Sequence, residues 1–286
     1  PPHYHARLAS LEDGGGRDVE LVRDGSFLAI AAEDEYAAIK AAERVASAAT
    51  WDDCGGMEPQ DIYERLVTNE RVSLPVVDGV PRKDPVPDLA EPPAEAVATI
   101  TARYERPYHM HGSIGPSAAM ALYTDDGLTV WSQSQGIYIL RASMADALGM
   151  DEAQIQLIHV PAAGCYGHNG ADDVSLDAAL VARAVPGRPV LLKWTREDEH
   201  AWEPYGPGMV MDLCASLNAD GSVAAWSQET FSDTHIQRPR PGPNRVGAAR
   251  LLASRYLEDE LVLPPAQPGM GSHSGIHRNL DPVYTF

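Results

Sequence analysis

The sequence of 286 residues predicts an α+β fold, in which hairpins of short strands are combined with amphipathic helices. Three observations support this fold class. Asp-Gly turns at 24–25, 126–127 and 220–221 separate pairs of short apolar runs, as in β-hairpins. Between residues 36 and 49, apolar and small residues recur every three or four positions, as on one face of a helix. Between residues 119 and 194, strand-like and helix-like segments alternate.

The first 90 residues are expected to hold one hairpin and one helix. Strand-like runs at 18–22 and 27–31 flank the first Asp-Gly turn. The helix that follows has Glu33 or Asp34 as its cap and ends near residues 50–51. Six prolines lie between residues 75 and 93, with few apolar residues among them. We therefore expect a linker there and a division into domains 1–90 and 91–286.

Beyond residue 90, the sequence predicts mixed sheets and helices. Strands are expected at 96–104, 119–123, 128–131, 155–160, 190–194, 209–217 and 223–231. Helices are expected at 137–148, 174–185 and 251–263. Gly149 and the Pro186-Gly187 pair are suitable ends for the first two of these helices. The last residues, 283–286, are strand-like.

Composition excludes some classes of function. The formal net charge is −19, which argues against a nucleic-acid surface and favours good solubility. No run approaches the roughly 20 apolar residues of a membrane helix, and the first residues do not resemble a signal peptide. The three cysteines, Cys54, Cys165 and Cys214, form no CxxC pair, and their odd number disfavours a disulfide scaffold. A periplasmic and a cytoplasmic location both stay open.

The most informative motif is the glycine-rich segment 160–170, which joins a predicted strand to a predicted helix. Its three glycines, Gly164, Gly167 and Gly170, allow the backbone to approach a ligand closely. Free backbone N–H groups before a helix suit an anionic group such as phosphate or an oxo ligand. A purely structural turn is the alternative.

A second polar segment, 131–136, also lies between a predicted strand and a predicted helix. It contains two glutamine amides, Gln133 and Gln135, which could hydrogen-bond an oxo group or the edge of a heterocycle. The alternative is that Ser132 or Ser134 merely caps the helix.

Histidines and cysteines offer further alternatives. His109 and His111 would lie on one face of a strand, as a possible metal pair, and His273 and His277 have i, i+4 spacing. No HExxH motif accompanies them, so we expect no metal bound by protein ligands. Cys165, three residues before His168, could act as a nucleophile, whereas a serine nucleophile would lack a GxSxG elbow.

Taken in order, these segments resemble the xanthine oxidase/aldehyde oxidase family of molybdenum hydroxylases, and most closely the large subunit of the isoquinoline 1-oxidoreductase type. Residues 23–42, followed by Trp51, resemble the family's α/β hammerhead domain. Residues 108–117 resemble the start of its molybdopterin-binding domain. The segment 131–135 is similar to the family motif Trp-Ser-x-x-Gln. The resemblance covers almost the whole chain and places it in the middle of a large subunit.

The resemblance also implies roles for individual residues. Gln135 would contact the oxo ligand of molybdenum without binding the metal itself. Gly164, Cys165, Tyr166, Gly167 and His168 stand where other members have Gly-Gly-Phe-Gly-Gly, beside the pterin. The replacements at 165, 166 and 168 should make this pocket more polar and more crowded. Gly170 replaces an acidic residue of the purine-oxidising branch, so purine specificity is not expected.

The function implied by the resemblance is hydroxylation of an N-heterocycle or aldehyde, with water as the oxygen source. The cofactor would be a molybdopterin, with its cytosine dinucleotide form as one option. The catalytic base, a Glu in a Gly-x-Gly-Glu motif, is absent here, so the chain alone should be inactive. A non-catalytic docking domain and a Cys- or His-dependent hydrolase are the alternatives.

The resemblance implies partners as well. These are the remaining large-subunit segments, a small subunit with 2Fe-2S clusters, and a cytochrome c acceptor. The strand-like end at 283–286 and the apolar half of the predicted helix 137–148 are the surfaces on which we expect the missing segments to pack.

Overall fold

The computed structural model describes residues 1–52, 61–88, 91–234, 238–240, 247–272, 275–280, 282 and 284. Contacts between residues divide the chain into two compact units. Unit 1 combines residues 1–58, 111–204 and 237–264, and unit 2 combines residues 59–110, 205–236 and 265–286. The predicted division near residue 90 concerns the domains of the family, and it stays a prediction.

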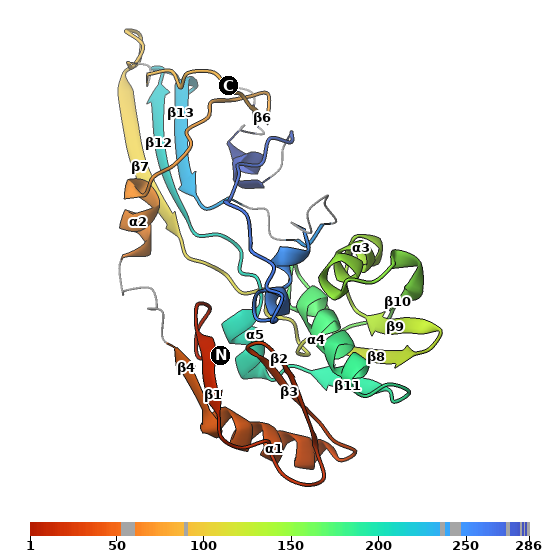
Figure 1. Cartoon of the computed structure of the whole chain (residues 1–286). Helices are drawn as coiled ribbons and strands as arrows, with labels where there is room; N and C mark the ends of the chain where they lie inside the picture. Colours follow the sequence, from red (N-terminus) through yellow and green to blue (C-terminus); the bar gives the residue numbers. More distant parts are fainter. Residues whose placement is uncertain are drawn as a thin grey trace. The chain divides into compact units, whose positions relative to one another are not determined.

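The N-terminal part of unit 1 has two antiparallel strand pairs and one helix (Figure 1). These elements are β1 (Arg7–Leu11), β2 (Glu20–Asp24), β3 (Phe27–Ala31), α1 (Glu35–Ala48) and β4 (Ala49–Asp52). The predicted hairpin is confirmed as β2 and β3. The predicted helix is confirmed as α1, and the side chain of Asp34 caps it by accepting from the N–H of Ala37 at 2.8 Å. No local signal indicated that Thr50 and Trp51 belong to β4, which pairs with β1.

The larger part of unit 1 is a four-stranded sheet with two helices. The sheet order is β10 (Ile155–His159), β9 (Gly127–Ser132), β8 (Ala118–Thr124) and β11 (Val190–Lys193), and the helices are α3 (Ile137–Leu148) and α4 (Ala171–Ala184). β8 and β9 form the predicted hairpin, whereas β9 and β10 run parallel. α3 has the predicted bounds and ends at Gly149 in the left-handed conformation. α4 begins three residues earlier than predicted, directly after the glycine turn.

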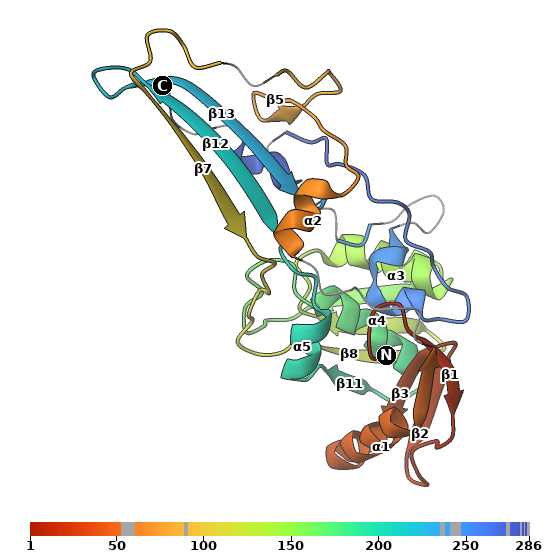
Figure 2. The ribbon, with the colours of Figure 1, turned by 90° about the vertical axis from the view of Figure 1, so that its left-hand side faces the viewer.

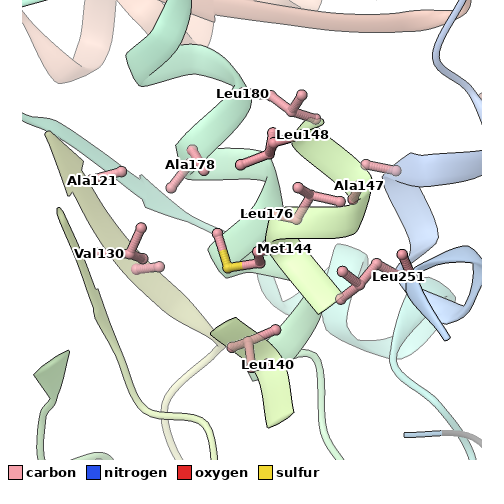
Figure 3. Close-up of a cluster of buried hydrophobic side chains, with 14 of the residues drawn as sticks. Ala121, Val130, Leu140, Met144, Ala147, Leu148, Leu176, Ala178, Leu180 and Leu251 are labelled. Atoms are coloured by element: carbon pink, nitrogen blue, oxygen red, sulfur yellow. The ribbon is translucent and has the colours of Figure 1, made fainter. Parts of the chain in front are cut away.

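The core of unit 1 lies between these two helices and the sheet (Figure 3). α3 contributes Leu140, Met144 and Leu148, and α4 contributes Leu176. Full burial of such side chains stabilises the fold by roughly 1.5–3 kcal/mol each. The expectation that the apolar half of α3 forms a partner surface is therefore wrong for these residues, because they pack inside unit 1.

Two further segments of unit 1 differ from the sequence prediction. A helix, α5 (Arg196–Trp202), was not predicted, although Thr195 and Asp198 form a capping box at its start. The helix predicted at 251–263 is wrong. A short 3₁₀ turn at Leu252–Arg255 forms instead, after another at Ala248–Arg250, and the rest of the segment is irregular. Leu251 is nevertheless buried in the core. The apolar residues of this segment therefore indicate buried positions and not a helix.

Unit 2 is built on a three-stranded antiparallel sheet (Figure 2). Its strands, in order, are β13 (Val223–Ser232), β12 (Met209–Leu217) and β7 (Ala98–Arg106), close to the predicted bounds. Leu66 of the short helix α2 (Ile62–Thr68) packs against Val210 and Phe231 of the sheet. The predicted linker contains a short hairpin, β5 (Val76–Val77) and β6 (Val80–Pro81), and a 3₁₀ turn, η4 (Gly275–Asn279), lies near the C-terminus.

Of the strand predicted at 283–286, only Tyr284 is described, and it lies in a bend; Val283, Thr285 and Phe286 lie outside the described residues. Within the described ranges, no helix combines the length and the apolar character that crossing a bilayer requires.

Candidate functional site

The two polar segments of the sequence meet because of the sheet topology. β9 ends at Ser132 and continues into Gln133–Gln135, and β10 ends at His159 and continues into the glycine-rich segment. The two strands are parallel neighbours, with His159 opposite Ser132. Segments that follow the carboxyl ends of parallel strands lie at the same edge of a sheet, which is where ligands bind in open α/β sheets.

Ser132 and Ser134 shape the first segment and attach it to α4. Ser132 Oγ accepts from the N–H of Ser134 at 3.1 Å and lies 2.7 Å from Ser175 Oγ of α4. Ser134 Oγ accepts from the N–H of Gly136 at 3.1 Å. The N-cap of α3 is Gly136, and no side chain caps it, so the simple capping alternative is wrong.

The glycine turn has an unusual backbone. Gly164, Tyr166 and Gly167 all have positive φ values, of 93°, 54° and 144°. A Cβ atom at Gly167 would lie 2.2 Å from His111 Cδ2, so the turn packs its bare backbone against that imidazole. Gly170 meets Trp194 in the same way, with 2.3 Å between the added Cβ and the indole ring. This packing explains why no acidic side chain fits at position 170.

Asp172, in the first turn of α4, connects the two segments. Its side chain is only 4% exposed, and its carboxylate accepts from Ser134 Oγ. The carboxylate also lies 3.0 Å from His168 Nε2 and 3.5 Å from Arg238 Nη1. Burial by itself would raise the pKa of Asp172, but the hydrogen bonds from His168 and Ser134 and the charge of Arg238 bring that pKa below its ordinary value. Asp172 is therefore a buried, charged anchor.

Gln135 lies at the exposed end of this network. Its Oε1 accepts from Arg238 Nη2, and its Nε2 donates to Cys165 Sγ. Residues of the two sequence motifs, Gln135 and Cys165, are thus in direct contact. Their role at a cofactor stays a prediction. Tyr166 is 64% exposed, and its ring lies against Gly164.

The amide of Gln133 is also available for a ligand. Its Nε2 is buried and has no hydrogen-bond partner among the described residues. A buried donor of this kind carries a desolvation penalty unless a ligand or water satisfies it. Gly136, in the same segment, faces open space, since a Cβ there would meet no atom within 4 Å.

The structure argues against the nucleophile hypothesis for Cys165. His168 pairs with Asp172, and Cys165 pairs with Gln135, so the described contacts include no hydrogen bond between the thiol and the imidazole. Cys214 lies in β12 and belongs to no predicted motif, and Cys54 lies outside the described residues.

The histidine pair at 109 and 111 does not occupy a strand. Residues 109–111 form an isolated bridge between His109 and Gly206, followed by irregular chain. Arg106 Nε lies 3.4 Å from His109 Nδ1, and Glu203 Oε1 lies 3.4 Å from His111 Nδ1. His277 contacts the carbonyl oxygen of Gly271 at 2.6 Å, and His273 lies outside the described residues. In the part of the chain that the structure describes, no three His, Cys, Asp or Glu residues are arranged to hold a metal ion.

Two members of the network were not candidates in the sequence. Asp172 had a local signal, because it lies four residues after His168 and in the first turn of a helix. Arg238 had none, because it lies in an irregular, proline-rich segment more than 60 positions away from Asp172. Only the tertiary structure brings this guanidinium to the site.

Comparisons with known proteins identify the family of the chain. The profile of the molybdopterin cofactor-binding domain family matches residues 82–244, more than half of the chain. The chain is 42% identical to one of the subunits of nicotinate dehydrogenase from Pseudomonas putida over 214 residues, which are 74% of this chain and 17% of that protein. It is 27% identical to the aldehyde oxidoreductase molybdenum-binding subunit PaoC of Escherichia coli over 221 residues, which are 73% of this chain and 30% of that protein.

The fold is also found among solved structures. Quinoline 2-oxidoreductase from Pseudomonas putida 86 matches with a TM-score of 0.61 and 16% sequence identity, over 82% of this chain and 35% of that chain. This likeness shows a shared fold. The chain spans less than a third of the length of the two curated relatives. On the family profile and on the identity to the first relative, the chain belongs to the molybdopterin cofactor-binding domain family.

Proposed function

We propose that this chain forms one wall of the molybdenum-pterin site of a hydroxylase that oxidises an N-heterocycle, with water as the source of oxygen. The observation that carries the proposal is the contact between Gln135 and Cys165 at the carboxyl edge of β9 and β10. It joins the two motifs that resemble cofactor-binding segments of the family. An aldehyde is the alternative substrate class, because one relative is an aldehyde oxidoreductase.

The residues at this edge fit such a cofactor. The amides of Gln133 and Gln135 offer neutral N–H donors, one of them buried without a partner among the described residues. Gly136 leaves open space beside these amides, since a Cβ there would meet no atom within 4 Å, whereas the rings of Tyr166 and His111 cover Gly164 and Gly167. Neutral donors and an adjacent guanidinium suit the oxygen atoms of an anionic group better than further carboxylates would. The bound cofactor would supply the redox chemistry.

In this proposal, the chain's own residues position the cofactor and set its electrostatic surroundings. Gln135 would hold an oxygen ligand of the metal through its amide nitrogen. Asp172 is engaged by Ser134, His168 and Arg238, so it would act as a structural anchor and not as a base. The base that takes the proton during hydroxylation would come from a segment with the motif Gly-x-Gly-Glu, which this sequence lacks.

The partners are part of the same proposal. The relative from nicotinate dehydrogenase is by its name one subunit of a larger enzyme. We propose that the chain works with the remaining large-subunit segments and with a subunit that carries 2Fe-2S clusters, and that a cytochrome c receives the electrons. The cytosine dinucleotide form of the pterin is proposed on the resemblance alone.

The test is native purification of the complex that contains this chain, followed by molybdenum analysis and intact-mass measurement of every chain. We expect about one molybdenum per complex and oxidation of nicotinate or a related N-heterocycle. Gln135→Ala should lower kcat at least about tenfold, because an amide that contacts the reacting centre is lost. Gln156→Ala is the matched control, since that glutamine is exposed on β10. A natively purified complex without molybdenum or pterin would contradict the proposal and favour a non-catalytic docking domain.

A further inference from the structure

The side-chain amide of Gln135 is held at both ends. Arg238 Nη2 donates to its Oε1, and its Nε2 donates to Cys165 Sγ. A guanidinium has only donors, so it can contact the oxygen of an amide and not the nitrogen. Arg238 therefore selects one of the two amide orientations, the one in which the NH₂ group faces the glycine turn.

Arg238 is in turn fixed by a second contact. Its Nη1 lies 3.5 Å from Asp172 Oδ2, so the two arms of one guanidinium reach two different side chains. Asp172 is itself held in place by Ser134 and His168. The guanidinium thus connects a buried, immobile carboxylate to an exposed amide. Lysine has a single ammonium group on a flexible stem and cannot reproduce this forked geometry.

We propose that Arg238 is a positioning residue that, braced against Asp172, orients the Gln135 amide so that its nitrogen faces the cofactor side of the site. This inference rests on the proposed function, because the orientation matters only if Gln135 serves a ligand. A simpler role is that Arg238 only neutralises the buried charge of Asp172. A lysine at position 238 could neutralise Asp172, but it could not also orient the Gln135 amide.

One readout needs no cofactor. Cys165 accepts from the Gln135 amide, so loosening that amide should uncover the thiol. We would compare the rate of alkylation of Cys165 by iodoacetamide with that of Cys214, a second free thiol that lies in β12, by peptide mass mapping. In the native complex stripped of cofactor, Arg238→Gln should raise the Cys165 rate about tenfold, the size expected when one hydrogen bond to a charged group is lost. The rate of Cys214 should stay unchanged.

Variants at position 238 separate positioning from neutralisation. Arg238→Lys should keep the melting temperature of the complex near wild type, because it keeps a positive charge beside Asp172. Iodoacetamide should nevertheless alkylate Cys165 of this variant as fast as Cys165 of Arg238→Gln. In the loaded complex, both variants should alter the Mo(V) electron paramagnetic resonance signal, while molybdenum content stays within about twofold. Arg240→Gln, two residues along the same segment, is the control and should match wild type in every readout.

The outcomes distinguish the two proposals. If wild-type complex lacks molybdenum, the proposed function fails, whatever the alkylation rates are. If wild-type complex holds molybdenum and Arg238→Lys behaves as wild type while Arg238→Gln does not, Arg238 is only a counter-charge and the positioning role is overturned. Unchanged alkylation of Cys165 and an unchanged resonance signal in Arg238→Gln also overturn it. If Arg238→Gln does not fold, Arg238→Lys alone still decides.

Discussion

The carboxylate of Glu203 contacts both the backbone N–H and the imidazole of His111. Glu203 Oε1 accepts from the N–H of His111 and lies 3.4 Å from its Nδ1. One turn earlier on α5, the fully buried Glu199 accepts from the N–H and the hydroxyl of Ser117, at 2.8 and 2.9 Å. α5 thus brings two buried carboxyl groups beneath the segment that leads into β8.

This arrangement predicts a pH-dependent stability. Burial, together with the neighbouring Glu199, raises the pKa of Glu203 from its ordinary value of 4.5 to about 7. The folded state therefore binds an extra proton between about pH 4.5 and 7, and stability falls as pH rises through that window. Glu203→Gln cannot ionise, so its melting temperature relative to wild type should be higher at pH 8.5 than at pH 5.

The control for this prediction is Glu197→Gln, because Glu197 is exposed on the same helix. Its difference from wild type should be small and independent of pH. A Glu203→Gln difference that stays constant from pH 5 to pH 8.5 would show that Glu203 does not titrate in this window.

Neutralisation of two aspartates of α4 should change the stability of the fold to different extents. The pKa of Asp172 is lowered, and its carboxylate forms ion pairs with Arg238 and His168. Asp172→Asn removes that negative charge and should therefore destabilise the fold by about 2 kcal/mol at pH 7. Burial raises the pKa of Asp177 to about 7, and asparagine can still accept from Trp194 Nε1. Asp177→Asn should therefore change stability by less than about 1 kcal/mol.

Urea unfolding at several pH values measures both variants. The folded-state pKa of Asp172 is below its ordinary value of 3.8, so its contribution is present above that value and is lost as pH falls through the folded pKa. The deficit of Asp172→Asn should accordingly shrink in strong acid. A larger loss for Asp177→Asn than for Asp172→Asn would refute the assignment of Asp172 as the charged anchor.

Local signals explain what the sequence could predict. The Asp-Gly turns identified three hairpins, and Gly149 identified the end of α3, because each depends on a few neighbouring residues. The segments around Gln135 and Cys165 stood out for the same reason, as polar and glycine-rich turns after strands. The contact between them required the parallel pairing of β9 and β10, which no local pattern specifies.

Nonlocal effects explain what the sequence could not predict. Residues 251–263 bury Leu251 in the core without forming a helix, and the N–H of Leu252 donates to Asp173 of α4 at 2.7 Å. That bond satisfies the backbone N–H of Leu252 through a tertiary contact, which no local pattern of the sequence specifies. Arg238 reaches the site in the same nonlocal way.

Gly167 offers a test of the glycine turn. Alanine there would adopt φ near 144° and place its Cβ 2.2 Å from His111 Cδ2, so Gly167→Ala should destabilise unit 1 by about 2 kcal/mol or more. Gly112→Ala is the comparison variant, because Gly112 has a positive φ of 64°, which L-residues adopt more readily, and a Cβ there meets no atom within 4 Å. Thermal unfolding should show a larger loss for Gly167→Ala, both from the close approach to His111 and from a backbone conformation that L-residues adopt less readily than that of Gly112. Equal losses would show that His111 moves aside freely.

Unit 2 exposes an apolar face on its sheet. The register places Ile100 of β7 opposite Ala215 of β12 and Ala215 opposite Trp226 of β13, so these side chains share one face. Tyr104 lies on the same face of β7, since it is four residues after Ile100. Ile100 and Tyr104 are each 57% exposed and Trp226 is 38% exposed. α2 packs against the opposite face, through Val210 and Phe231.

This face predicts how the isolated chain behaves. Contiguous exposed apolar side chains on an edge strand favour association, both through apolar burial and through unpaired backbone groups. We expect the chain, purified alone, to self-associate in a concentration-dependent manner in sedimentation velocity. The double variant Ile100→Ser, Tyr104→Ser should shift it toward monomer, whereas Thr101→Ser, on the other face of β7, should not. If the proposed remaining subunit segments cover this face in the native complex, the amides of β7 should be protected from hydrogen exchange there. A dilution-stable monomer for the unmodified chain would mean that this face needs no partner.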